Sequence, residues 1–173
     1  MSVFLQWIII VPDSETICLC GSNSEYSLCC EPFHKKEITP ATAEALMRSR
    51  FTAYANKNED YLLNTWETAK RPEAIDFSKE EAVWTNLDIV KTKKGREKDS
   101  KGIVEFKAYY SLDDEPYVMN EISRFIKKAG RWFYLDGLVK SVAKVGQQVD
   151  QGKNAPCSCG SGKKFKRCCG KEL

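Results

Sequence analysis

Residues 41–66 read ATAEALMRSRFTAYANKNEDYLLNTW and decide the fold, because apolar residues recur there at helical spacing. Thr39 and Pro40 precede the stretch as a capping hydroxyl and a first-turn proline, which predicts a helix from there to about Ala55. A second helix is predicted from Asn58 or Glu59 to Trp66. The inward-facing residues of the two helices are predicted to be Ala43, Leu46, Met47, Phe51 and Tyr54, then Tyr61, Leu62 and Trp66.

Strand patterns follow these helices. Ser78–Glu81 has the S-x-x-E form of a capping box and predicts a short helical turn through Trp84. Residues 87–92 alternate imperfectly between apolar and polar, and Lys128–Arg131 predicts a hairpin turn into Trp132–Val139. Residues expected on shared strand faces are Val104, Phe106, Ala108 and Tyr110; Ile122, Arg124 and Ile126; and, opposite these last three, Glu121, Ser123 and Phe125. Helices first and antiparallel strands afterwards predict an α+β fold.

Eight cysteines form two groups of four with the same spacing, C-x-C-x8-C-C. In both groups Gly-Ser follows the second cysteine, and an aromatic residue stands six residues after it, at Tyr26 and Phe165. The groups are Cys18, Cys20, Cys29 and Cys30, and Cys157, Cys159, Cys168 and Cys169. This is an internal repeat of a short unit at opposite ends of the chain.

Each cysteine group has the pattern of a tetrahedral zinc site. Residues i and i+2 of an extended segment project to one side, so each C-x-C pair can offer two sulfurs to one ion. Disulfides are the first alternative, but the adjacent cysteines make strained partners. An iron–sulfur cluster is the second, but the spacing differs from that of ferredoxins. We therefore expect two zinc tetrathiolates, both closed and structural.

The second group also resembles a known motif. CSCGSGKKFKRCC, residues 157–169, closely resembles the SEC-C motif, and CLCGSNSEYSLCC, residues 18–30, is a looser match in which Asn23 replaces the second glycine and the lysines are missing. Residues 41–66 are similar to the segment that follows the first motif in the YchJ-like family of bacterial proteins. Further similar pieces are 102–106, 121–125 and 131–137.

The resemblance implies a middle domain of the nuclear transport factor 2-like fold, a curved antiparallel sheet with helices packed in its cone. It implies no defined activity. We expect this division of the chain: 1–15, an apolar N-terminal segment; 16–36, a zinc knuckle; 37–140, the α+β domain; 141–154, a linker; and 155–173, the second zinc knuckle.

The N-terminal segment MSVFLQWIIIV predicts neither a membrane span nor a secretory signal. A spanning helix needs about 20 apolar residues, whereas Pro12-Asp13 ends this run. A signal needs a basic start, and the first basic residue is Lys35. We expect a cytoplasmic protein without membrane insertion.

Charge is uneven along the chain. Residues 153–173 hold six basic residues and one acid, whereas the other 152 residues hold 21 basic and 23 acidic ones, within an overall net charge of +3. By resemblance, the second knuckle is an interaction surface for a protein or ribosomal partner, with candidate contacts at Lys163, Lys164, Phe165, Lys166 and Arg167. Residues 91–101 are also basic, but they read as an exposed hairpin connection. Nucleic acid is the weaker interpretation because no aromatic residues are interleaved there.

Cone-shaped folds often enclose a pocket, which gives a second hypothesis: a domain that binds or converts a small molecule. Candidate pocket residues are Arg50, Trp66, Glu121, Arg124 and Asp136, with Tyr54 and Tyr110 as walls; they could orient a carboxylate or serve as acid and base. The alternative is that these charges pair as structural salt bridges. A non-enzymatic protein is favoured because no nucleophile motif, phosphate loop or open metal site accompanies them. His34 is expected at the surface.

Overall fold

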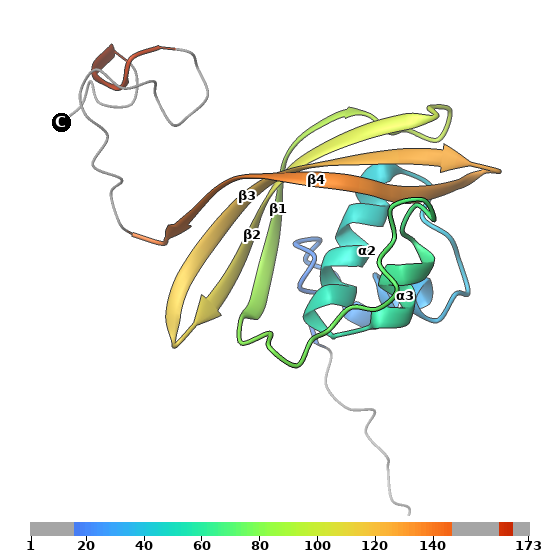
Figure 1. Ribbon diagram of the computed structural model, residues 1–173, viewed down its shortest axis with the longest axis horizontal. Coiled ribbons are helices and arrows are strands. Elements are labelled where there is room, and N and C mark those ends of the chain that lie inside the picture. The colour runs from blue at the N-terminus through green and yellow to red at the C-terminus, as the bar shows by residue number, and fades with distance from the viewer. Residues whose placement is uncertain (1–15, 147–162, 168–173) are drawn as a thin grey trace, which may run out of the picture.

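Helices α2 (Ala43–Ala55) and α3 (Glu59–Asn64) lie on one side of a curved four-stranded antiparallel sheet, which confirms the α+β fold (Figure 1). The computed structural model describes residues 16–146 and 163–167. The N-terminal apolar segment, most of the expected linker and the four C-terminal cysteines lie outside these residues.

Helix α2 begins at Ala43, three residues after the predicted first position at Pro40, and ends at Ala55 as predicted. The residue that caps it is Thr42, whose side-chain oxygen accepts a hydrogen bond from the backbone nitrogen of Ala45 at 3.1 Å. Helix α3 follows the same rule, since Asn58 Oδ1 accepts from the backbone nitrogen of Tyr61 at 3.0 Å. Both starts therefore depend on a polar side chain that satisfies a first-turn N–H group.

The strands run β1 (Val83–Lys94), β2 (Lys101–Leu112), β3 (Glu115–Lys128) and β4 (Arg131–Lys144), and pair in that order. The predicted turn joins β3 to β4, with Ala129 and Gly130 both in the left-handed region. Strand β4 extends four residues into the expected linker.

The helical turn predicted from Ser78 is wrong. Residues 78–82 contain no helix, and Trp84 lies in β1. Glu80, between the two ends of the expected box, makes other contacts: its Oε2 accepts from the Tyr54 hydroxyl at 3.0 Å, and its Oε1 accepts from the backbone nitrogen of Ala82 at 3.1 Å. The S-x-x-E pattern is present, but no helix follows it.

The sheet is irregular at four places, and these irregularities increase its twist. Register shifts occur twice between β1 and β2 and twice between β3 and β4, where Arg124 pairs with Asp136 but Phe125 pairs with Tyr134. In Figure 1 the sheet bends around α2. The main core fills this bend and includes Leu46, Phe51, Leu87, Val104, Phe106, Phe125 and Trp132.

Residues 65–67 add a short parallel bridge beside β4. Thr65 O accepts from the backbone nitrogen of Tyr134, and the backbone nitrogen of Glu67 donates to Tyr134 O, both at 2.8 Å. Trp66 is thereby fixed next to Tyr134, with their rings perpendicular and 5.0 Å apart. This bridge holds one wall of the space between α2 and the sheet.

Candidate metal centre and pocket

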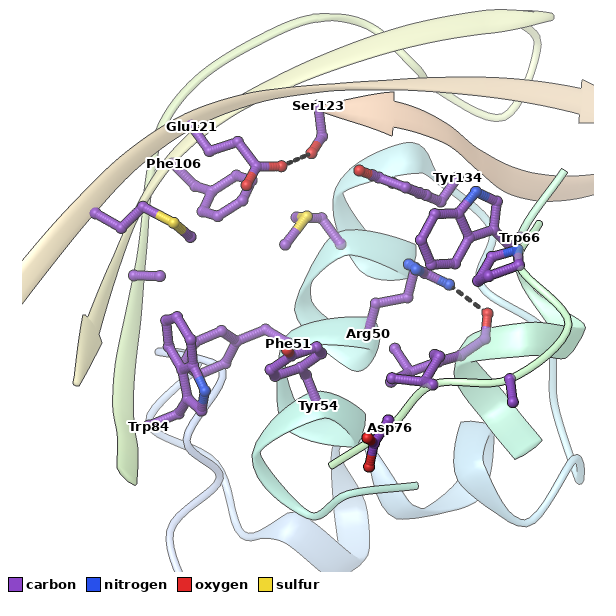
Figure 2. A pocket seen from close by; sticks show the side chains of 17 residues that line it. Arg50, Phe51, Tyr54, Trp66, Asp76, Trp84, Phe106, Glu121, Ser123 and Tyr134 are labelled. Carbon is purple, nitrogen blue, oxygen red and sulfur yellow. Dashed lines mark hydrogen bonds between the residues drawn. The ribbon is translucent and has the colours of Figure 1, made fainter. Parts of the chain in front are cut away.

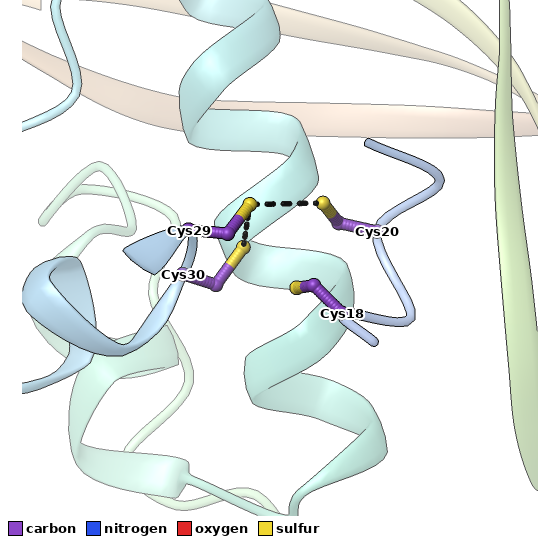
Figure 3. Close-up of side chains that lie close together, drawn as sticks. All are labelled: Cys18, Cys20, Cys29 and Cys30. Atoms are coloured by element: carbon purple, nitrogen blue, oxygen red, sulfur yellow. Dashed lines mark hydrogen bonds between the residues drawn. The ribbon is translucent and has the colours of Figure 1, made fainter. Parts of the chain in front are cut away.

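The four N-terminal cysteines meet at one point (Figure 3). Their sulfur atoms all lie within 4.8 Å of one another, and Cys18, Cys20 and Cys30 are buried. The Cys20 and Cys29 sulfurs are 3.5 Å apart, those of Cys29 and Cys30 are 3.8 Å apart, and none of the four cysteines forms a disulfide. A tetrahedron with zinc–sulfur bonds of about 2.3 Å has edges of about 3.8 Å, so this donor set fits zinc.

Short local elements bring the sulfurs together. The backbone nitrogen of Cys18 donates to Ser24 O at 2.8 Å, which folds the C-x-C segment back on itself. The 3-10 helix η1 (Tyr26–Leu28) then returns the chain to Cys29, and helix α1 (Glu31–His34) follows Cys30. The second pair therefore lies at the start of a helical turn.

Hydroxyl groups surround the sulfurs. Thr52 Oγ1 on α2 lies 3.6 Å from the sulfurs of both Cys18 and Cys30, and Ser22 Oγ lies 3.1 Å from that of Cys29. Such outer contacts orient metal ligands and tune their basicity.

The thiols of this cluster differ in acidity. Hydrogen bonds with Cys18 and Cys30 hold the pKa of the Cys20 thiol far below its ordinary value, whereas hydrogen bonds with Cys18 and Cys20 raise that of Cys30. Burial raises the pKa of Cys29 to about 11. The Cys20 thiolate is thus stabilised by hydrogen bonds from neighbouring thiols. Ionisation of all four cysteines would require a positive ion at their centre.

The knuckle is docked on the body through Arg48 of α2. Its Nη1 donates to Cys20 O at 2.6 Å, while Nε and Nη2 donate to Glu44 Oε1 at 3.0 and 2.9 Å. Gly21, at φ +74°, lies directly against the backbone of Leu87 in β1, where any Cβ would overlap the carbonyl oxygen. The loop of residues 18–30, the candidate metal loop, is therefore packed between α2 and β1.

His34 is half-buried, so the expected surface position is wrong. Its Nε2 donates to Ser49 O and its Nδ1 accepts from the Tyr26 hydroxyl, both at 2.8 Å. Burial lowers its pKa. His34 therefore connects Tyr26 to α2. Its short spacing after Cys30 is the sequence signal from which this position could have been predicted.

The C-terminal copy shares the turn geometry of the first where the structure describes it. Helix η2 (Phe165–Arg167) begins at the repeated aromatic position, as η1 does. In the first copy the backbone nitrogen of Leu28 donates to Glu25 O at 3.1 Å, and in the second that of Arg167 donates to Lys164 O at 2.8 Å. The charged candidate contacts are exposed: Lys163, Lys164, Lys166 and Arg167.

A cavity of about 570 Å³ lies between α2 and the sheet (Figure 2). Three predicted pocket residues line it, namely Arg50, Trp66 and Glu121. The other two do not: Arg124 and Asp136 pair with each other at 2.5 Å outside the cavity, where Lys70 also contacts Asp136 at 2.6 Å. For this pair the alternative of a structural salt bridge is correct.

Of the expected wall residues, Tyr54 lines the cavity, whereas Tyr110 packs against Trp84 with ring centroids 4.8 Å apart. Trp84, Ser123 and Tyr134 line the cavity and were not predicted. Ser123 shares the Glu121 face of β3 and could have been found from that alternation. Tyr134 could not, because its place depends on the register shift between β3 and β4.

Residues 91–101 form the end of β1, an exposed connection and the start of β2, as the hairpin interpretation predicts. Among the described residues, no helix has both the length and the apolar character that a membrane crossing requires.

Comparison with known proteins gives matches over both expected parts. The family model "YchJ, middle NTF2-like domain" matches residues 42–137, and the SEC-C motif matches residues 154–171. For the N-terminal repeat, the support is the cysteine geometry described above.

Similar proteins span nearly the whole chain. A UPF0225 protein of Vibrio vulnificus strain YJ016 is 41% identical over 164 residues, covering 88% of this chain and 98% of that protein. A UPF0225 protein of Serratia proteamaculans is 43% identical, covering 90% and 98%.

Two solved structures are also similar. A SEC-C motif containing protein from Rhodopseudomonas palustris, solved in solution, has a TM-score of 0.64 and 32% identity, covering 73% of this chain and all of that one. A crystal structure of a SEC-C motif containing protein from Psychrobacter arcticus has a TM-score of 0.59 and 30% identity, covering 91% and 97%.

Proposed function

This chain belongs to the UPF0225 family and carries its YchJ-type middle domain, and from that premise we propose that it is a non-enzymatic zinc protein of the bacterial cytoplasm. The N-terminal zinc site holds the knuckle on the domain. The C-terminal zinc knuckle contacts an acidic protein or ribosomal partner.

The observation that carries the proposal is the convergence of four sulfur atoms in a nearly closed, buried site. Four thiolate ligands leave a zinc ion no open position for water, so a site of this kind is structural rather than catalytic. Reduced thiols are also typical of the cytoplasm, where disulfides are rare.

The surroundings support a structural role. A zinc tetrathiolate has a net charge of −2, and the hydroxyl of Thr52 can donate to a thiolate. Arg48 is the cation that docks the loop, through Cys20 O. Metal binding would thus fix residues 18–30 against α2, whose other residues contribute to the core and the cavity wall.

The C-terminal knuckle supports a contact role by its charge. The turn that it shares with the first knuckle carries four exposed basic residues, whereas the corresponding residues of the first copy, Ser24, Glu25, Ser27 and Leu28, carry no positive charge. A rigid basic turn attracts acidic surfaces through its electrostatic field.

Elemental analysis of protein purified under reducing conditions tests the metal. We expect two zinc ions per chain, one after Cys18→Ser with Cys20→Ser, and one after Cys157→Ser with Cys159→Ser. Iron, or no metal at all, would contradict the proposal.

Reversal of the tail charges tests the contact role without removing the metal ligands. The variant carries Lys163→Glu, Lys164→Glu, Lys166→Glu and Arg167→Glu. The matched control reverses four exposed lysines at the end of β1 and in the connection after it, Lys91, Lys93, Lys94 and Lys98. Partners are captured from a lysate by affinity purification, and each purified candidate is then tested for rebinding. We expect the tail variant to lose partners and the control variant to keep them. Equal capture by both variants, with zinc retained, would contradict the contact role but leave the metal role standing.

A further inference from the structure

The cavity between α2 and the sheet contains a buried cation without an anionic partner. Arg50 is 7% exposed, and among the residues that the structure describes no carboxylate oxygen lies within 4.0 Å of its nitrogens. Burial lowers its pKa to about 10, which leaves the guanidinium charged at neutral pH. A buried charge without a counter-ion costs several kcal/mol of folding free energy, so its retention calls for an explanation.

One nitrogen of the Arg50 guanidinium has a structural role. Nη1 of Arg50 donates to Leu62 O and to Thr65 Oγ1, both at 2.7 Å, and so caps the end of α3. Within the described part of the chain, Nε and Nη2 make no hydrogen bond. Two of the three nitrogens therefore remain available to a ligand.

The surrounding rings fix the direction of the guanidinium. Its central carbon lies 4.5 Å from the ring centroid of Tyr134 and 5.2 Å from that of Trp66. Figure 2 shows Arg50 reaching from α2 toward these two rings, across the cavity from Glu121 and Phe106. An arginine held in this way presents a planar pair of donors, the geometry that matches a carboxylate.

The rest of the lining restricts the ligand further. Arg50 is the one cation among the described residues that line the cavity, which also carries the carboxylates of Asp76 and Glu121. A phosphate group, with nearly two negative charges, would be poorly compensated here. Most other lining side chains are apolar or aromatic, among them Met47, Phe51, Leu62, Trp84, Phe106 and Met119. A volume of about 570 Å³ is typical of sites for small organic molecules.

The wall opposite Arg50 is built around Glu121. Its Oε1 accepts from the Ser123 hydroxyl at 2.6 Å. Gly137 of β4 makes room for this carboxylate, since a Cβ at that position would overlap Glu121 Oε1 and lie 2.9 Å from the Tyr134 hydroxyl oxygen. This wall would repel a second negative charge and can accept a hydrogen bond from a ligand hydroxyl.

We propose that the cavity binds a small organic monocarboxylate with an apolar body, and that Arg50 holds its carboxylate. The aromatic and methionine side chains cover the body. This function is separate from the metal and contact roles proposed above, and its failure would leave those standing.

Pairs of probe molecules that differ only in charge test whether the cavity selects a carboxylate. Zinc-loaded full-length protein is titrated with trans-cinnamate and indole-3-acetate, each against its primary amide, and dissociation constants are measured by calorimetry and ligand-observed NMR. We expect each acid to bind roughly 10- to 100-fold more tightly than its amide, the range that a charge-assisted hydrogen bond supplies. Phenyl phosphate serves as the phosphate probe and should bind more weakly than the acids.

Three variants locate the site. Arg50→Lys keeps the charge but loses the planar pair of donors, so the preference for acid over amide should fall about tenfold. Ala108→Met fills the cavity from β2 and should abolish binding of acid and amide alike. Arg124→Gln, on the outer salt bridge, should bind as the unaltered protein does. The Ala108 variant keeps the test valid even if changes at Arg50 prevent folding.

Several results would overturn the proposal. They are equal binding of acid and amide, tighter binding of phenyl phosphate than of the acids, full affinity in Arg50→Lys or Ala108→Met, and no binding of any probe at its solubility limit.

Discussion

Arg48 Nη1 donates a 2.6 Å hydrogen bond to the carbonyl oxygen of Cys20, which ties the metal loop to the helix that also carries Arg50. The same guanidinium also donates to Glu44 Oε1 through Nε and Nη2. The domain and its knuckle are thus one packed unit over residues 18–55.

Metal removal should loosen the knuckle and leave the sheet intact. The cysteines contact α2, whereas the strands pack through residues such as Val104 and Phe125 that touch no cysteine cluster. With a zinc chelator, we expect faster amide hydrogen exchange at residues 18–34 and along α2, and unchanged exchange in β2 and β3. Identical exchange with and without metal would contradict a structural zinc site.

A methyl group at position 21 should detach the metal loop. Gly21→Ala places a Cβ onto Leu87 O at a positive φ, and we expect it to lower the free energy of unfolding by about 3 kcal/mol or more. The matched control is Gly130→Ala, which has a similar φ of +79° but nothing within 4 Å of its Cβ. That variant should cost about 1–2 kcal/mol.

Denaturant titrations and zinc analyses of Gly21→Ala and Gly130→Ala separate the cost of backbone strain, which both variants have, from that of steric overlap, which only Gly21→Ala has. If the two substitutions cost the same and both proteins keep their zinc, the packing of the loop on β1 contributes nothing.

Thr52→Val should weaken metal binding without changing the shape of the helix. The substitution removes the hydroxyl that lies 3.6 Å from two cysteine sulfurs. We expect zinc affinity to fall about 10- to 100-fold, as for the loss of other outer-shell hydrogen bonds. Competition with a chromogenic chelator measures it. Thr85→Val, at an exposed site on β1, is the control and should retain full affinity.

The outer salt bridge should contribute to stability only above acidic pH. Arg124, and then Lys70, hold the pKa of Asp136 well below its usual range. A carboxyl group with a lowered pKa stabilises the fold above its unfolded pKa, about 3.9, and this contribution is lost as the pH falls through the folded value. Because solvent screens the pair, we expect Asp136→Asn to cost about 0.5–1 kcal/mol at pH 7.

Urea titrations of Asp136→Asn and the unaltered protein between pH 7 and about 2.5 measure this contribution. Metal release at low pH affects both proteins, so the difference between them isolates the carboxyl group. The difference should shrink steadily as the pH falls below the unfolded pKa, and Arg124→Gln with Lys70→Gln should reproduce it. A difference that stays constant with pH would contradict the assignment.

The cysteine cluster could be predicted from the sequence because its constraint is local. Four cysteines within thirteen residues leave the chain few ways to separate their sulfurs, and the repeat pointed to one geometry for both copies. Helix α2, the hairpin at Ala129-Gly130 and the α+β order are also set by short-range signals.

The pocket could be predicted only in part, because its walls come from distant elements. Strand alternation already placed Arg124 on the face opposite Glu121, so the two could not line one cavity. The register shift that pairs Arg124 with Asp136 but Phe125 with Tyr134 cannot be read from residue propensities. The Ser78 pattern forms no helix, and the neighbouring Glu80 instead accepts a hydrogen bond from Tyr54, a contact across 26 residues that the local sequence does not indicate.

Thr52 and Arg50 lie two residues apart on α2, one beside the sulfurs and the other in the cavity. Two binding events that act on one helix are subject to thermodynamic reciprocity. If a ligand in the cavity changes the affinity for metal by some factor, bound metal changes the affinity for that ligand by the same factor. If that factor differs from one, occupancy of the cavity depends on the zinc available to the cell.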